Sequence, residues 1–495
     1  MRTIEHWIGG SETSGASTRR SQVWNPAKGE AQAELVLAEP SDVDAAVESA
    51  KKAYDSWRNV SLTRRARIMF AFRDLVDRNL DKLAQIVSDE HGKVISDAKG
   101  EVIRGMEVVE FACGIPQLLK GEYSEQVSTD VDAYSFRQPL GVCAGITPFN
   151  FPVMVPMWMH PMAIATGNTF VLKPSERDPS ASNFIAQLYA EAGLPDGVFN
   201  VVHGDKVAVD ALLDHADVAG VSFVGSTPIA RYVYETGTQQ GKRVQALGGA
   251  KNHMIVLPDA DIEMAADAAV SAAYGSAGER CMAVSQVVAV GDVADPLIAA
   301  IKARIPKVKV GDGLEPDSEM GPLVTREHRD KVASYLEGAG SEGGTVVVDG
   351  RESAPEGDGF FLGVSLIDDL KPGMKAYDDE IFGPVLGVTR VATYDEAVRL
   401  VNENPYGNGT AIFTRDGGVA RQFQFEVQAG MVGINVPIPV PVAYYSFGGW
   451  KASLFGDTHI YGPEGINFYT RGKVVTQRWP DPATSKVDLG FPQTR

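Results

Sequence analysis

The chain has 495 residues, of which 44% are hydrophobic and 22% are charged, a balance typical of folded globular proteins rather than disordered ones. Its length exceeds what one hydrophobic core usually supports, so we expect two or more domains. The 64 acidic residues outnumber the 46 basic ones and leave a net charge of −18, which argues against a nucleic-acid or anionic-membrane surface.

The cysteines and the apolar segments bear on the cellular compartment. The first residues lack a basic segment followed by an apolar one, so we expect no secretory signal. Prolines interrupt the most hydrophobic stretch, 152–161, and no apolar run reaches the roughly 18 residues that cross a membrane. Cys113, Cys143 and Cys281 are odd in number and widely spaced, which offers neither a disulfide framework nor a zinc pattern. We therefore expect a cytoplasmic protein without a bound metal.

The first 120 residues are predicted to be mainly helical. Ser41, with Asp44 three residues later, is a candidate N-cap for the first long helix. From 62 to about 113 apolar residues recur at helical spacing, with a break at 91–92. Arg104 falls in the last of these helices, where a lone arginine is usually solvated or paired at the surface.

Residues 123–140 alternate apolar and polar side chains, which predicts an amphipathic hairpin with little core of its own. Such a ribbon commonly packs against something else, and a second subunit is a candidate partner. The tail from Ile466 to Trp479 also has a strand-like pattern.

Between 141 and 257 strand and helix signals alternate at the spacing of βαβ units. Strands are predicted at 142–146, 169–173, 198–203, 220–224 and 243–247. Helices are predicted between most of them, including 180–192, 206–213 and 228–236. Such units form a parallel sheet with ligands at the carboxyl ends of its strands. No Gly-x-Gly-x-x-Gly fingerprint occurs at the required place, so a nucleotide site here would have a different design.

After Asp259 the alternation continues and predicts a second α/β domain. Its predicted elements are the helices 262–274, 296–304 and 394–402 and the strands 287–290 and 345–348. This domain carries Cys281, whose neighbour Arg280 is expected to lower the thiol pKa and favour the reactive thiolate. The alternative is a buried structural cysteine, as we expect for Cys113 and Cys143 in their apolar runs.

Six strings resemble the aldehyde dehydrogenase superfamily, in order and spacing, from Trp7 to about Arg471. They are Thr147-Pro-Phe-Asn-Phe-Pro152, Lys173-Pro-Ser-Glu176, Phe223-Val-Gly-Ser226, Leu247-Gly-Gly249, Gly278-Glu-Arg-Cys-Met-Ala283 and Glu380-Ile-Phe-Gly-Pro384. The resemblance implies an α/β fold with a Rossmann-variant NAD-binding domain (1–122 and 141–250) and a catalytic domain (251–445). It also implies a small β-hairpin oligomerisation domain (123–140 and 466–495), which builds homotetramers in this family.

The same resemblance implies the contacts to NAD. Lys173 and Glu176 match adenosine-ribose contacts, and a carboxylate there repels a 2′-phosphate, so NAD is favoured over NADP. The alternative for this pair is a solvated Lys/Glu ion pair. Ser226 matches a position near the pyrophosphate at a helix start, and Ala230 stands where many relatives have glycine. The remaining matches, which include the nicotinamide contacts, are Thr147, Phe149, Gly225, Glu380 and Phe382.

The resemblance also assigns the catalytic groups. Cys281 would attack the aldehyde, and Asn150 with the backbone N–H of Cys281 would hold the oxyanion, where one donor is worth roughly 3–4 kcal/mol. Hydrolytic relatives carry a glutamate where this chain has Ala246, and loss of such a base typically costs about 10²–10⁴-fold. We therefore expect a thiol such as coenzyme A, rather than water, to take the acyl group.

A narrower resemblance connects the chain to the methylmalonate-semialdehyde dehydrogenase family, through 249–253, 279–283, 435–441, 446–447 and 456–457. That family oxidises malonate or methylmalonate semialdehyde with NAD and CoA, releases CO2 and forms acetyl-CoA or propionyl-CoA. Arg104 and Arg280 match its arginines for the substrate carboxylate, a task that suits a planar guanidinium. The alternatives are a hydrolytic NAD-dependent dehydrogenase of another short acid semialdehyde and a non-catalytic protein that kept the fold. The choice between the two semialdehydes stays open.

Overall fold

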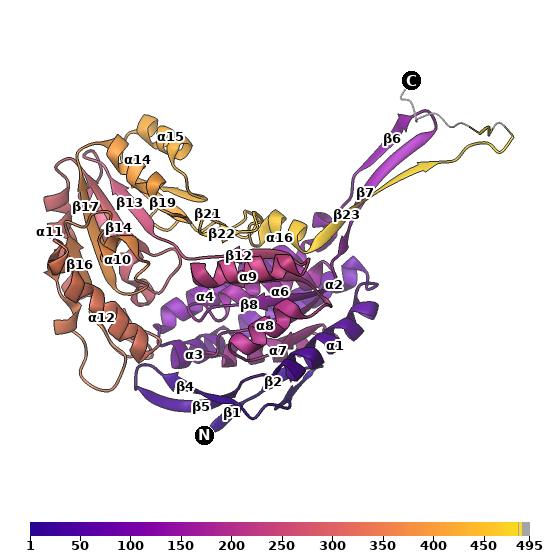
Figure 1. Cartoon of the computed structure of the whole chain (residues 1–495), viewed down its shortest axis with the longest axis horizontal. Helices are drawn as coiled ribbons and strands as arrows, with labels where there is room; N and C mark the ends of the chain where they lie inside the picture. The colour runs from indigo at the N-terminus through magenta and orange to yellow at the C-terminus, as the bar shows by residue number, and fades with distance from the viewer. Residues whose placement is uncertain (484, 488–495) are drawn as a thin grey trace.

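The computed structural model describes residues 1–483 and 485–487, in which two large sheets dominate (Figure 1). The first has eight strands in the order β22-β12-β11-β8-β9-β10-β2-β3, of which the five from β12 to β10 are parallel. They are β8 (Val142–Ile146), β9 (Thr169–Lys173), β10 (Phe199–Val201), β11 (Val218–Val224), β12 (Arg243–Leu247), β22 (Leu454–Phe455), β2 (His6–Ile8) and β3 (Ser11–Thr13). All five predicted strands of this region are confirmed, three of them with the predicted bounds.

Helices cover both faces of this sheet because its strands alternate between two apolar clusters. Cys143 of β8 packs in one cluster, and its neighbours Val142 and Ala144 pack in the other. The Cys143 face is covered by α2 (Leu62–Arg78), α3 (Leu80–His91), α4 (Ile95–Cys113), α6 (Met154–Ala165) and α7 (Ser180–Glu191). The other is covered by α1 (Pro40–Trp57), α8 (Lys206–Asp214) and α9 (Thr227–Gln239). Cys113 and Cys143 are buried as predicted.

The predicted N-cap of α1 is wrong. The helix begins at Pro40, so Ser41 lies inside it, and Glu39 is the capping residue. Asp42 completes a capping box by accepting a hydrogen bond from the Glu39 backbone N–H at 3.0 Å. Glu39 and Asp42 therefore form the capping box that Ser41 and Asp44 were expected to form.

The second sheet has seven strands, all parallel except β15, in the order β15-β16-β17-β14-β13-β19-β20. They are β13 (Asn252–Val256), β14 (Val284–Val290), β15 (Thr345–Val348), β16 (Ser365–Asp368), β17 (Val385–Val391), β19 (Gly409–Phe413) and β20 (Met431–Ile434). One face packs on α10 (Ile262–Tyr274), α11 (Ala294–Arg304) and α12 (Arg326–Ser341), and the other on α14 (Tyr394–Glu403) and α15 (Gly417–Glu426). The predicted α/β architecture is confirmed.

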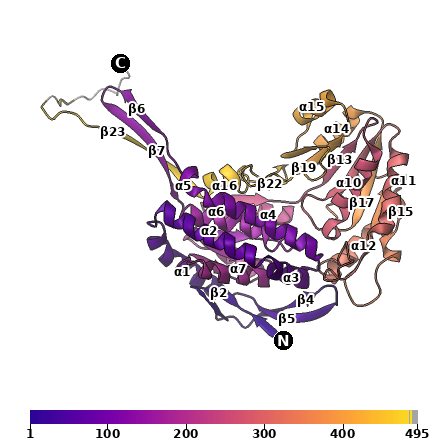
Figure 2. The same ribbon diagram turned by 180° about the vertical axis from the view of Figure 1, so that it is seen from behind.

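A three-stranded sheet projects from the body as an arm (Figures 1 and 2). It joins β6 (Tyr123–Ser128) and β7 (Val131–Pro139) to β23 (Thr470–Arg478). The predicted hairpin is therefore present, but residues 466–468 are helical, because they belong to α16 (Gly462–Phe468), and one residue separates this helix from β23. The domain boundaries stay predictions, and residues 484 and 488–495 of the expected oligomerisation domain lie outside the described residues.

Smaller elements complete the described chain. These are β1 (Arg2–Ile4), β4 (Arg20–Asn25), β5 (Glu30–Val36), α5 (Ile115–Leu118), α13 (Lys375–Asp378), β18 (Tyr406–Gly407) and β21 (Trp450–Lys451). Within residues 1–483 and 485–487, every helix is too short or too polar to cross a membrane.

Candidate active site

Cys281 lies in a strained connection between α10 and β14, where the two large sheets meet. Ser276, Ala277 and Gly278 have φ values of 54°, 52° and 72°, and a non-glycine residue in this region costs of order 1–3 kcal/mol. The carbonyl of Cys281 accepts hydrogen bonds from the side-chain amides of Asn252 at 2.9 Å and Asn408 at 3.2 Å. Contacts from the first residue of β13 and from the residue just before β19 therefore hold the cysteine at the end of this turn.

The thiol of Cys281 opens on a cavity of about 370 Å³. Burial raises the pKa of this thiol to about 12, and the Glu380 carboxylate adds to the rise. Arg280 acts in the opposite direction but more weakly, and its guanidinium is paired with Asp97. Arg280 thus lowers the thiol pKa, as predicted, but the effect of burial is larger than that of the neighbouring cation, so the thiolate is not favoured.

Asn150 reaches the same connection from the loop after β8. Its side-chain Nδ2 donates to the carbonyl oxygen of Glu279 at 2.9 Å, which leaves the second amide hydrogen for another acceptor. The residue is buried, at 3% exposure, so that hydrogen bond is shielded from water. The structure thus brings together the two residues predicted to form the nucleophile and the oxyanion donor.

A buried ion pair between Lys93 and Glu101, which was not predicted, holds the backbone of Asn150 in place. The Lys93 ammonium donates to the carboxylate of Glu101 at 2.7 Å and to the backbone oxygen of Asn150 at 2.6 Å. Glu101 also accepts from the backbone N–H groups of Val153 and Met154 at 2.8 and 3.1 Å. Burial raises the pKa of Glu101, and the charge of Lys93 opposes that rise. The pair therefore ties α4 to the turn that carries Asn150.

Both predicted arginines line the cavity of Cys281. The Arg280 guanidinium pairs through Nη2 with Asp97 at 2.6 Å, and this charge lowers the pKa of Asp97 although burial alone would raise it. Arg104 pairs with Glu107 at 2.7 Å and donates to the carbonyl of Pro441 at 2.9 Å. Apolar walls come from Phe151, Trp158 and Phe447. The cavity therefore combines a thiol, two guanidinium groups and an aromatic lining.

Ala246 lies in β12 and is fully buried. Its side chain packs in the apolar cluster that contains Ile146 and Phe223, and its strand partners are Phe223 and Phe455. A methyl group in these surroundings has no capacity to take a proton from water.

The predicted ribose contacts lie at the carboxyl end of β9. The Lys173 ammonium donates to the carbonyl of Gly204 at 2.7 Å and to the Glu176 carboxylate at 3.3 Å. Burial tends to raise the pKa of Glu176, but Lys173 and backbone hydrogen bonding bring it below the usual value. Glu176 is thus kept as an anion that can accept hydrogen bonds from a diol.

Glu380 and Phe382 lie on the other flank of Cys281 and line a common pocket with it. Glu380 accepts from the backbone N–H of Ala250 at 2.9 Å, and burial raises the pKa of its carboxyl to about 7. A Cβ at Gly249 would lie 2.2 Å from a Glu380 oxygen, so the lack of a side chain at this position lets the Glu380 carboxylate lie where it does. Phe382 has a φ of 57°, and its carbonyl accepts from the His328 ring at 2.6 Å.

The remaining predicted cofactor residues follow the strand ends. Thr147 is buried at 4% exposure, and its hydroxyl has no hydrogen-bond partner within the described part of the chain. The ring of Phe149 meets that of Phe382 edge-on, with centroids 5.9 Å apart. Gly225 and Ser226 form the turn from β11 into α9, with Ser226 as the N-cap residue. All these groups lie where the carboxyl ends of parallel strands bring ligand contacts together.

Comparisons with known proteins agree with this geometry. The model of the aldehyde dehydrogenase family matches residues 13–475. A malonate-semialdehyde dehydrogenase of Pseudomonas aeruginosa is 54% identical over 496 residues, covering 99% of this chain and all of that protein. The crystal structure of methylmalonate-semialdehyde dehydrogenase from Oceanimonas doudoroffii superposes with a TM-score of 0.96 at 55% identity, covering 98% of this chain and 99% of the other.

A structure from Sinorhizobium meliloti, described as a methylmalonate-semialdehyde dehydrogenase in complex with NAD, has the same TM-score of 0.96. It is 51% identical and covers 98% of this chain and 99% of its own. The family match spans far more than half of the chain, and the resemblance inferred from the six sequence strings is confirmed. The chain belongs to the aldehyde dehydrogenase family.

Proposed function

We propose that this protein is an NAD- and CoA-dependent dehydrogenase that oxidises and decarboxylates malonate or methylmalonate semialdehyde through a thioester on Cys281. The observation that carries the proposal is the cavity that Cys281 shares with Arg104 and Arg280. An aldehyde with a carboxylate at its other end matches such a cavity, with its carbonyl at the thiol and its anion at the guanidinium groups. The names of the relatives in Pseudomonas and Oceanimonas agree with this substrate class.

The first chemical step is attack of the Cys281 thiolate on the aldehyde carbon. The negative charge then develops on the former carbonyl oxygen, for which the free amide hydrogen of Asn150 and the backbone N–H of Cys281 are donors. Preorganised donors of this kind stabilise a transition state without having to reorient during the reaction. The contacts of Lys93 to the Asn150 backbone supply part of that preorganisation.

The residues on the cofactor flank fit NAD. Glu176 is anionic and suits a ribose diol, and the unpartnered hydroxyl of Thr147 is buried next to the same strand ends. Gly249 keeps open the approach to Glu380, which would hold the second ribose. Bound there, NAD would supply the hydride acceptor that converts the adduct on Cys281 to a thioester.

Decarboxylation follows from the position of the substrate carboxylate. In the thioester it lies β to a carbonyl, so the electrons of the broken C–C bond can pass to the thioester oxygen as CO2 leaves. Asn150 would stabilise the resulting enolate oxygen with the donor used in the first step, and the enolate carbon would then take a proton from solvent to give the acetyl or propionyl thioester.

The acyl group is proposed to pass to CoA because Ala246 replaces the base that would activate water. A thiolate needs no such base in the protein to cleave a thioester. The buried methyl of Ala246, among apolar neighbours, supports slow hydrolysis.

We further propose a homotetramer located in the cytoplasm. The exposed strands of the arm, β6 and β23, leave backbone groups available for pairing with another subunit. The cytoplasmic location rests on three free cysteines, which suit a reducing compartment.

The decisive test measures NADH and the acyl product from malonate semialdehyde with and without CoA. We expect acetyl-CoA at a rate that depends on CoA, with little free acid when CoA is withheld. Free acid formed equally fast without CoA would contradict the proposal and favour a hydrolytic dehydrogenase. Loss of NADH formation in Cys281→Ala, with the fold retained, would exclude a non-catalytic protein.

A further inference from the structure

Asp97 is the one acidic side chain that pairs with Arg280 within the described residues. Both groups are mostly buried, with 21% of the Arg280 side chain and 18% of the Asp97 side chain exposed. The Asp97 carboxylate engages only Nη2, at 2.6 Å. Within the described residues, Nε and Nη1 of Arg280 have no hydrogen-bond partner. A guanidinium binds a carboxylate bidentately through Nη2 together with either Nε or Nη1, so Nε and Nη1 each remain available as a donor on one of these two edges.

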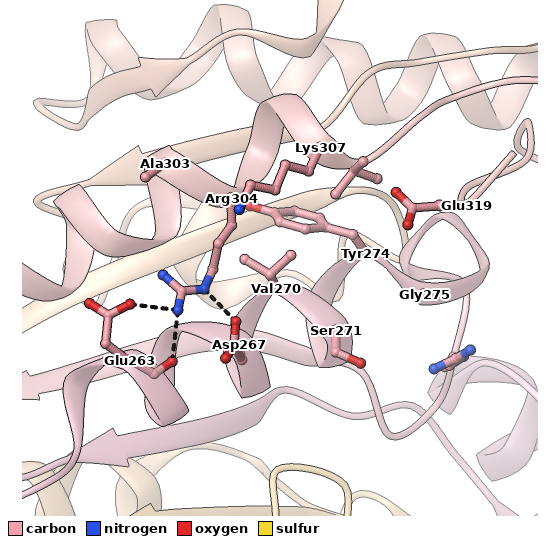
Figure 3. Close-up of a pocket in the computed structure, with 12 residues that line it drawn as sticks. Glu263, Asp267, Val270, Ser271, Tyr274, Gly275, Ala303, Arg304, Lys307 and Glu319 are labelled. Carbon is pink, nitrogen blue, oxygen red and sulfur yellow. Dashed lines mark hydrogen bonds and ion pairs between the residues drawn. The ribbon is translucent and has the colours of Figure 1, made fainter. Parts of the chain in front are cut away.

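The Arg280 side chain has space to turn away from Cys281. A cavity of about 590 Å³ lies on its other side, between α10 and α11, and Arg280 lines this cavity as well as that of Cys281. Figure 3 shows the second cavity with Gly275 at its rim and with Glu263 and Asp267 contacting Arg304. An unrestrained guanidinium would therefore have both room and acidic groups on the side away from the thiol.

Gly275 provides the space that the guanidinium occupies. A Cβ at this position would lie 2.6–2.9 Å from the Arg280 atoms Nη1, Cζ and Nη2. The backbone does not demand glycine, because its φ is −55° and any L-residue adopts that value. The small residue is thus explained by contact with the guanidinium rather than by the turn.

We propose that Asp97 and Gly275 are positioning residues that fix the Arg280 guanidinium on the Cys281 side and thereby set selectivity for aldehydes that carry a carboxylate. Asp97 fixes Nη2, and the bare backbone of Gly275 lets the planar group lie against it. The inference rests on the proposed function, in which Arg280 receives the substrate carboxylate.

Asp97 could affect substrate binding through its negative charge or by holding the Arg280 guanidinium in place, and the two explanations predict opposite changes in KM when Asp97 is removed. If charge alone mattered, removing an anion beside Arg280 would strengthen the attraction for a second carboxylate and lower its KM. If position matters, the same change frees the guanidinium and raises that KM. The sign of the change therefore distinguishes the two explanations.

The experiment compares malonate semialdehyde with propanal, a neutral aldehyde, in Asp97→Ala, Asp97→Asn and Gly275→Ala. We expect Asp97→Ala to lower kcat/KM for the acid semialdehyde about 10-fold or more, mainly through KM, with propanal changed less than about threefold. Asp97→Asn keeps an oxygen acceptor and should retain more of the selectivity than Asp97→Ala. Gly275→Ala should lose selectivity with Asp97 intact.

Asp81→Ala is the control, because Asp81 of α3 pairs at 2.7 Å with Lys99 of α4, the helix that carries Asp97, but lines neither cavity. It should leave both substrates unchanged. A lower KM for the acid semialdehyde in Asp97→Ala, or equal losses on both aldehydes, would overturn the positioning role. Unchanged selectivity in Gly275→Ala would overturn the role of that residue.

Arg280→Leu separates this inference from the function on which it rests. If Arg280→Leu keeps its preference for the acid semialdehyde, the proposed carboxylate site itself is wrong. If Arg280→Leu loses that preference but Asp97→Ala keeps it, only the positioning inference fails. Adding Asp97→Ala to Arg280→Leu should cause little further loss, since both act through one guanidinium.

Discussion

The two flanks of Cys281 hold their charged groups in different ways. On the arginine flank, Arg280 and Arg104 are each paired with a carboxylate of a single helix, α4. On the cofactor flank, Lys173 and Glu380 bond to backbone groups at strand ends, and only Glu176 adds a side-chain partner.

Because of this difference, a single substitution can remove a contact on the arginine flank more readily than a backbone contact on the cofactor flank. Backbone contacts at strand ends follow from the sheet and persist whatever side chains surround them. Side-chain pairs on one helix can be exchanged by single substitutions. We therefore expect changes on the arginine flank to alter which aldehyde is used, and changes on the cofactor flank to alter which nucleotide is bound.

The largest effect is expected where the flanks meet. Cys281→Ala should lower kcat by about 10⁴–10⁶-fold, because the covalent step has no other nucleophile. NAD binding, measured by quenching of protein fluorescence, should be retained because the contacts of that flank are untouched. Activity within tenfold of the parent would exclude the thioester mechanism.

Asn150→Ala should lower kcat by about 10²–10³-fold on acid and neutral aldehydes alike, since the oxyanion forms with both. Steady-state kinetics with malonate semialdehyde and propanal measures this. A loss confined to one aldehyde would place Asn150 in substrate recognition instead.

Arg280→Leu removes a guanidinium from the arginine flank and leaves the cofactor flank unchanged. We expect kcat/KM for malonate semialdehyde to fall by about 10–100-fold, the worth of charge-assisted hydrogen bonds, with little change for propanal. Equal losses on the two aldehydes would remove the carboxylate role of this residue.

Glu176→Gln removes a negative charge from the cofactor flank and leaves the arginine flank unchanged. The carboxylate that repels a 2′-phosphate is lost, so the preference for NAD over NADP should fall by about tenfold. The ratio of kcat/KM for the two nucleotides measures this, at saturating aldehyde. A preserved ratio would mean that other groups select the nucleotide.

The smallest effect concerns the thiol itself. Because burial raises the pKa of Cys281 to about 12, its alkylation by iodoacetamide should keep rising with pH, about tenfold per unit from pH 7 to 10. Glu380→Gln removes a negative charge that raises this pKa, so alkylation at pH 9 should become about threefold faster. A rate that levels off near pH 8, or a slower rate in Glu380→Gln, would contradict this account.

Much of the fold could be predicted because buried parallel strands form short apolar runs between helices. The strands β8, β9 and β12 begin and end where the pattern predicts. The cap of α1 could not be predicted from Ser41, since several polar residues compete at this helix start and Glu39 with Asp42 forms the capping box instead.

The candidate site was predictable only where residues form motifs. Nothing in the sequence indicates that Lys93 and Glu101, eight positions apart, are buried as a pair. The pairing of Arg280 with Asp97 spans 183 positions and has no local signal. The raised thiol pKa is not predictable from the neighbouring Arg280, since burial, which the local sequence does not reveal, has the larger effect on Cys281.

The helix α4 carries three charged residues of the Cys281 cavity in a fixed register. Asp97, Glu101 and Arg104 lie on one face at intervals of four and three residues, and all line the cavity of Cys281. One residue inserted after Glu101 would turn Arg104 by about 100° about the helix axis and away from the cavity, while Asp97 stayed in place. A change in the length of this segment would therefore displace Arg104 from the site, whereas the exchange of one of the three side chains leaves the register of the other two unchanged.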